Sequence, residues 1–129
     1  MSPKVLDYSG VAVIAPVTVP YERSSTRGAD WFIGSALRKL IVEAGLQKQA
    51  IDGLSISSFT LAPDSPVSLV ENLGLRLRWL EQVSVGGASG VVALRKAARA
   101  IQSGDAEIVA CIGGDTANPQ SFAHLVSNF

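Results

Sequence analysis

A glycine-rich turn holds the residues whose types and spacing are best suited to chemistry. Residues 83–85, Val-Ser-Val, lead into Gly86, Gly87, Ala88 and Ser89, and an amphipathic helix is predicted to follow. Such a turn presents the first backbone N–H groups of the helix without intrahelical acceptors, at the helix end that favours negative charge. These groups can bind an oxyanion, a carboxylate or a phosphate. We therefore predict an oxyanion or substrate-binding site at Gly87, Ala88 and Ser89.

Few side chains could act as a nucleophile or a base, and each has an ordinary structural explanation. Ser89 could be a nucleophile only beside a base, and capping of the following helix already explains it. Cys111 is expected in a buried strand, where burial raises the pKa of a thiol and leaves it inert. His124 lies between apolar residues without an identifiable partner, which favours a structural or surface role. Asp115 either joins functional groups at a strand end or caps the next segment. We assign no catalytic side chain and no metal site.

The elements that must position the turn alternate between strands and helices, which predicts an α/β layered domain with a mostly parallel sheet. Right-handed crossovers would place helices on both faces, with the helix over residues 89–103 the most apolar and therefore the most buried. Gly45 should end the first long helix, and the polar residues 21–28 should form a solvated connection. We predict strands at 11–15, 54–57, 81–85 and 106–112, and helices at 30–44, 67–73, 89–103 and from Pro119 onward.

Composition limits the class of protein. The chain has 129 residues and formal net charge zero, so we expect one domain over residues 1–129 and no attraction to nucleic acid. Its one cysteine excludes an internal disulfide and a multi-cysteine metal site, and is compatible with a reducing cytoplasm. No apolar run approaches the length of a membrane-spanning helix, and the N-terminus does not look like a signal peptide.

The same residues resemble those of the thiolase superfamily. Thiolases carry a turn of the form Cys-Ala-Ser-Gly, with the nucleophilic cysteine at the start of a buried helix, and here the turn reads Gly87-Ala88-Ser89-Gly90. The sequence IVACIGGD over residues 108–115 resembles the strand and glycine pair that follow that helix in the family. Residues 51 and 52, Ile-Asp, match a turn before a strand. The nucleophile position therefore holds glycine, as in a thiolase-like protein related to the sterol-carrier-associated thiolases or the thiolase-like aldolases.

This resemblance implies a layered α/β/α thiolase-like N-terminal domain that is incomplete relative to the family, because family chains are several times longer. It also implies an acyl-CoA substrate, no further cofactor, a homodimer and, as in some aldolases of the family, a small OB-fold partner protein. In thiolase dimers, the strand before the nucleophile turn lies against its two-fold mate. The corresponding interface residues here would be Glu81, Gln82, Val83, Ser84 and Val85.

Two classes of function remain open. The first is a thiolase-superfamily enzyme acting on acyl-CoA thioesters in lipid or steroid side-chain metabolism, of aldolase type or resembling an acyltransferase. Aldolase chemistry is favoured because no acyl-cysteine can form at Gly87. The second is a non-catalytic α/β module that serves assembly with itself or a larger partner. We expect the chain by itself to lack thiolase activity.

Overall fold

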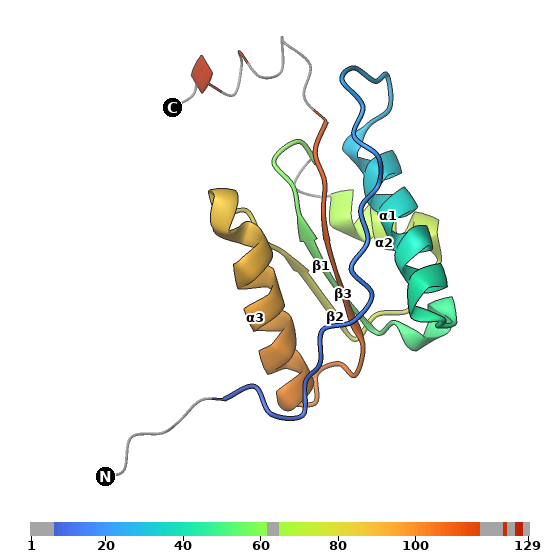
Figure 1. Ribbon diagram of the computed structural model, residues 1–129, viewed down its shortest axis with the longest axis vertical. Helices are drawn as coiled ribbons and strands as arrows, with labels where there is room; N and C mark the ends of the chain where they lie inside the picture. The colour runs from blue at the N-terminus through green and yellow to red at the C-terminus, as the bar shows by residue number, and fades with distance from the viewer. Residues whose placement is uncertain (1–6, 62–64, 117–122, 124–125, 128–129) are drawn as a thin grey trace.

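The chain forms a three-stranded parallel sheet with helices on both faces. The computed structural model describes residues 7–61, 65–116, 123, 126 and 127. Its helices and strands are α1 (Ala29–Ala44), β1 (Gly53–Ser57), α2 (Ser65–Leu73), β2 (Trp79–Gln82), α3 (Ser89–Gln102) and β3 (Val109–Gly113), with short 3₁₀ turns at Lys48–Ala50 and Gly86–Ala88. In Figure 1, α3 covers one face of the sheet, and α1 and α2 cover the other. The predicted α/β layered fold with a parallel sheet is confirmed.

Strand β1 is the centre of the sheet. It pairs in parallel with β2 along one edge and with β3 along the other, so that Ile56 lies between Gln82 and Ile112. Residues 53–56 are all buried. A strand buried without alternation is typical of a parallel sheet that is covered on both faces.

The two faces of β1 carry side chains of different size. Leu54 and Ile56 belong to a core of large aliphatic residues that includes Ile33 and Leu37 of α1. Ser55 lies beside Cys111 in the register of the sheet, and the Cys111 thiol reaches the Ala93 carbonyl of α3 at 4.0 Å. The α1 face is therefore filled by long side chains, whereas the α3 face is filled by short ones.

The helix predicted over residues 89–103 forms α3, which buries five of its 14 residues, against four of 16 in α1 and two of nine in α2. Its buried side chains are all small, namely Ser89, Ala93, Ala97, Ala98 and Ala100. The larger Val91 and Leu94 are 75% and 45% exposed. Because Ser55 and Cys111 are short, α3 approaches the sheet closely and packs on it through its own small residues.

Helix α1 ends as the sequence predicts. Gly45 adopts the left-handed conformation, with φ of 65°, and its N–H donates to the carbonyls of the last turn. The Leu46 N–H donates to Ile41 O at 3.1 Å, which completes a Schellman motif. The predicted helices at 30–44 and 67–73 are confirmed as α1 and α2, each with an earlier start.

Residues 11–15 do not form the predicted strand. The segment is extended and lies alongside β3 (Figure 1), but it carries no strand assignment, and Ala15 interrupts it with φ of 52°. Val13 and Ile14 are 75% and 61% exposed. An apolar groove of about 520 Å³ is lined by this segment, β3, α1 and α3.

Side chains from both helical layers hold the N-terminal segment in place. Lys39 of α1 donates to Thr18 O at 2.6 Å. Arg99 and Gln102 of α3 both donate to Asp7 O, at 2.6 and 3.2 Å. The segment is thus anchored at its two ends by carbonyl contacts with the helices, and an apolar sequence alone did not make it a strand.

The predicted bounds of the last two strands are also corrected. Strand β2 covers Trp79–Gln82 instead of 81–85, and β3 covers Val109–Gly113 instead of 106–112. Both shifts involve Asp52. Its carbonyl accepts from Arg78 N and Trp79 N, and its carboxylate accepts from Glu107 N and Ile108 N at 2.9 Å. These bonds start β2 early and hold residues 107 and 108 in a bend before β3. The helix predicted from Pro119 lies outside the described residues.

Gly53 is predicted to tolerate no side chain. A Cβ at this position would lie 2.7 Å from Val109 Cγ2 and 3.1 Å from Ala106 Cβ, inside a strand paired on both edges. We expect Gly53→Ala to lower the free energy of unfolding by about 1–3 kcal/mol through overpacking. Urea unfolding followed by circular dichroism measures the change. Gly87→Ala is the matched control, because a Cβ at Gly87 meets no atom within 4 Å. Equal stability of the two variants would contradict this account.

Candidate functional site

The loops that follow the three parallel strands meet at one edge of the sheet. Residues 58–61 follow β1, residues 83–88 follow β2 and residues 114–116 follow β3. The carboxyl edge of a parallel sheet is the usual position of binding sites in open α/β folds. The predicted site residues Gly87, Ala88 and Ser89 lie at this edge, and so does Asp115.

Asp115 binds the loop after β1 instead of facing an open site. Its Oδ1 accepts hydrogen bonds from Ser58 Oγ at 2.9 Å, Phe59 N at 2.6 Å, Thr60 N at 2.9 Å and Thr60 Oγ1 at 3.0 Å. Thr60 Oγ1 in turn accepts from Thr116 N at 3.0 Å. Of the two sequence hypotheses for Asp115, neither describes this role, in which one carboxylate joins the ends of β1 and β3.

The glycine turn is a short 3₁₀ helix that runs directly into α3. Gly86 requires glycine because its φ is +71°. The Ser89 hydroxyl accepts from Val85 N at 3.0 Å and donates to Gly86 O at 2.8 Å. Ser89 is therefore the first residue of α3 and closes the turn before it, which corrects the expectation that it caps the helix. Its own N–H donates to Gly86 O.

Gly87 is the position that the sequence resemblance matches to the nucleophile of the thiolase pattern. Gly87 and Ala88 are exposed, and a Cβ built on Gly87 would meet nothing within 4 Å. Unlike Gly86, Gly87 does not adopt a left-handed conformation. A side chain at Gly87 therefore fits both the space and the backbone, and its absence is not required by the fold.

The residues predicted to form a dimer interface differ in their accessibility. Glu81 forms an ion pair with Lys96 of α3, and Gln82 is half-buried at the end of β2. Val83 is only 3% exposed, and its N–H donates to Ile56 O at 2.8 Å. Ser84 donates to Ser58 O at 3.2 Å, and Val85 is exposed. Strand β2 is an edge strand of the sheet, as this prediction requires.

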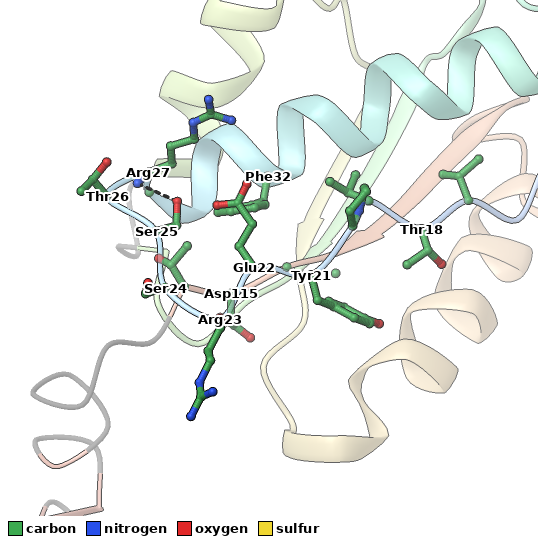
Figure 2. Close-up of a pocket in the computed structure, with 17 residues that line it drawn as sticks. Thr18, Tyr21, Glu22, Arg23, Ser24, Ser25, Thr26, Arg27, Phe32 and Asp115 are labelled. Carbon is green, nitrogen blue, oxygen red and sulfur yellow. Dashed lines mark hydrogen bonds between the residues drawn. The ribbon is translucent and has the colours of Figure 1, made fainter.

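A cavity that the sequence did not indicate lies beside the end of β3. It has a volume of about 770 Å³ and is lined by residues 17–28, Phe32 and residues 113–116. Figure 2 shows Arg23 and Arg27 extending in opposite directions from this loop. Arg27 stacks over the Trp31 ring at 3.8 Å. The arginines therefore do not converge on one anion, and the polar loop that was expected to be an ordinary connection forms a wall of the cavity.

The remaining chemical candidates lie elsewhere or outside the described part of the chain. Cys111 is in β3, and burial raises its pKa to about 11, as expected for an inert thiol. His124 is not among the described residues. Across residues 7–61, 65–116, 123, 126 and 127, no group of three or more metal-ligating side chains occurs. No helix in the described part of the chain could cross a membrane.

Comparison with known proteins identifies the class of fold to which this chain belongs. No family model matches the chain. In structure it is similar to OleA of Xanthomonas campestris with bound lauric acid and lauroyl-CoA, with a TM-score of 0.62 and 24% identity over 72% of this chain and 29% of OleA. It is also similar to 3-oxoacyl-(acyl carrier protein) synthase III of Xanthomonas oryzae, with a TM-score of 0.61 and 23% identity over 80% of this chain and 30% of the synthase. Such neighbours are thiolase-fold proteins, and this chain has the thiolase fold.

Within that class, two similarities are to aldolases. The chain is 30% identical to the steroid side-chain-cleaving aldolase of Thermomonospora curvata over 104 residues, which are 79% of this chain and 26% of the aldolase. It is 27% identical to the Ltp2-ChsH2(DUF35) aldolase, with a TM-score of 0.57, over 79% of this chain and 28% of that one. The chain thus spans about a quarter of the length of the curated relative that it matches.

Burial of Cys111 predicts a slow thiol with a steep pH dependence. With a pKa of about 11, only about one thousandth of the thiol is ionised at pH 8, and the thiolate is the reactive form. We expect alkylation by iodoacetamide, followed by mass spectrometry, to accelerate about tenfold per pH unit between pH 8 and 10. The same protein in denaturant should react on the order of a hundredfold faster at pH 8, because an exposed thiol has a pKa near 8.5. Equal rates in the folded and denatured protein would refute the burial of this thiol.

Proposed function

We propose that this chain is part of a thiolase-fold aldolase that cleaves or forms a C–C bond beside an acyl-CoA thioester, in steroid or other lipid side-chain metabolism. The observation that carries the proposal is the glycine at position 87, which leaves an open, sterically permissive site at the start of α3 without a nucleophile. The thiolase fold and the similarity to two aldolases support it.

Aldolase chemistry needs no covalent acyl-enzyme. When the Cα–Cβ bond of a β-hydroxyacyl-CoA breaks, its electrons move into the thioester carbonyl to form an enolate. The β-hydroxyl group gives its proton to a base and becomes the carbonyl group of the released product, and the enolate takes up a proton at Cα to give the shortened acyl-CoA. An enolate oxygen is stabilised by positioned backbone N–H donors. The turn at Gly87 and Ala88 is suited to supply such donors, because the first N–H groups of a helix lack intrahelical acceptors. Ser89 is less suited, since its N–H already donates to Gly86 O.

A second candidate is a non-catalytic module for assembly. It is favoured by the exposed apolar residues near the turn, because Val85, Val91 and Leu94 are 55%, 75% and 45% exposed. Apolar surface of this kind is typical of protein contacts. Within either proposal, we infer a homodimer, a small OB-fold partner protein and a cytoplasmic location, which the single cysteine permits.

The aldolase proposal predicts turnover without an acyl adduct. We expect no covalent label after incubation with an isotopically labelled acyl-CoA and mass spectrometry, because Gly87 offers no nucleophile. The chain assembled with its partners should release a carbonyl product from a β-hydroxyacyl-CoA. A stable adduct on Ser89 or Cys111 would overturn the proposal. If the assembled protein released no carbonyl product, the assembly module would be the better account.

The proposed dimer predicts that a charge on the exposed side of β2 dissociates it. Leu80 is 37% exposed on this edge strand, whereas Val83 is buried and a lysine there would disturb the core instead. We expect Leu80→Lys to shift the mass measured by light scattering at low micromolar concentration from dimer to monomer. Val42→Lys on the outer side of α1, 80% exposed, is the matched control and should remain dimeric. A monomeric parent protein would rule out the dimer.

A further inference from the structure

We propose that Asp115 is a positioning residue for the glycine turn, acting through Ser58 and Ser84. The network that it anchors begins at the end of β3, crosses the end of β1 and reaches the start of α3. The purpose of this positioning rests on the proposed function, because the turn is where the thioester oxygen is expected to bind.

The first link joins Asp115 to the loop after β1. Ser58 donates its hydroxyl proton to Asp115 Oδ1 at 2.9 Å, and its Oγ accepts from Leu61 N at 3.1 Å. Ser58 is buried, with 5% of its surface exposed. Breaking this link would leave a buried hydroxyl without its acceptor, which is costly. The position of Ser58 therefore depends on Asp115.

The second link joins that loop to the glycine turn. The Ser58 carbonyl accepts from Ser84 Oγ at 3.2 Å. Ser84 directly precedes Val85, whose N–H donates to Ser89 Oγ at 3.0 Å, and Ser89 donates to Gly86 O. Hydrogen bonds and short covalent stretches through Ser58 and Ser84 thus connect Asp115 to Gly86 without a break.

The turn has little else to hold it. Among the described residues, the side-chain hydrogen bonds that reach residues 84–88 are those made by Ser84 and Ser89. Gly86 and Gly87 have no side chains to pack, and Cβ atoms at both would meet open space. Besides the backbone bond from Ser89 N–H to Gly86 O, the turn is therefore held by two hydroxyl groups, one of which depends on the Asp115 network.

A thiol introduced at the turn can report its geometry without any substrate. The parent for this experiment is the chain with Gly87→Cys and Cys111→Ala, which carries one accessible thiol at the start of α3. A thiol at a helix start has a lowered pKa when the N–H groups are correctly placed. Its alkylation rate by iodoacetamide, measured across pH 6–10, gives its apparent pKa. None of the variants replaces Glu81 or Lys96, which form an ion pair beside the turn.

Three substitutions in this parent separate positioning from charge. We expect Asp115→Ala and Ser84→Ala each to slow alkylation at pH 7.5 by about 3–10-fold, since a displaced turn raises the thiol pKa by roughly half a unit to one unit. Asp115→Asn keeps an acceptor oxygen and removes the charge, so its rate should stay within about twofold of the parent or increase. Asp105→Ala, beyond the other end of α3, is the control acid and should change nothing.

The outcomes decide the proposal. If Asp115→Ala and Asp115→Asn accelerated alkylation alike, the carboxylate would act only by its charge and the proposal would fail. If Ser84→Ala and Asp115→Ala both kept the parental pH profile while losing stability, Asp115 would have a structural role only. If Asp115→Ala did not fold, Ser84→Ala alone would decide between these results. Because no acyl-CoA is used, failure here is distinct from failure of the aldolase proposal.

Discussion

The burial of residues 53–56 of β1 is the constraint on which the rest of this structure depends. A strand with no exposed face must be paired along both edges and covered on both sides. β2 and β3 satisfy its backbone, while α1 and α3 cover its two faces. The unequal side chains of β1 then decide how the helices pack. Leu54 and Ile56 engage the long aliphatic residues of α1, and Ser55 permits close approach of the alanine face of α3.

Elements with strong local signals could be predicted from the sequence. The periodic apolar face of α1, ended by Gly45, gave a helix within one residue of the observed bounds, and the sequence Leu-Ser-Ile-Ser at 54–57 gave the central strand. The segment at 11–15 is equally apolar but forms no strand. A strand there would need backbone pairing with β3, about a hundred positions later in the chain, and the local sequence does not specify that pairing. The sequence also could not show which residues of α3 are buried, because that depends on the small size of Ser55 and Cys111 in the sheet.

The candidate site shows the same division between local and long-range information. The glycine turn and the start of α3 were predicted because their signals lie within five residues. Asp115 was recognised as a strand-end residue, but its four donors come from residues 58–60, more than fifty positions earlier. The cavity beside β3 depends on a loop from residues 17–28 lying next to residues 113–116. The sequence shows the serine, threonine and arginine residues of that loop, but it does not show that residues 113–116 lie beside them.

Substitutions at Gly86 and at Gly87 meet different constraints. Gly86 is tied to folding by its left-handed backbone, so almost any replacement is penalised before function is considered. Gly87 has neither a steric nor a backbone requirement, so many side chains could occupy it at little cost in stability. The residue at position 87 is therefore free to vary with chemistry alone. A change of a single codon at position 87 would therefore alter the functional groups at the start of α3 without repacking the domain.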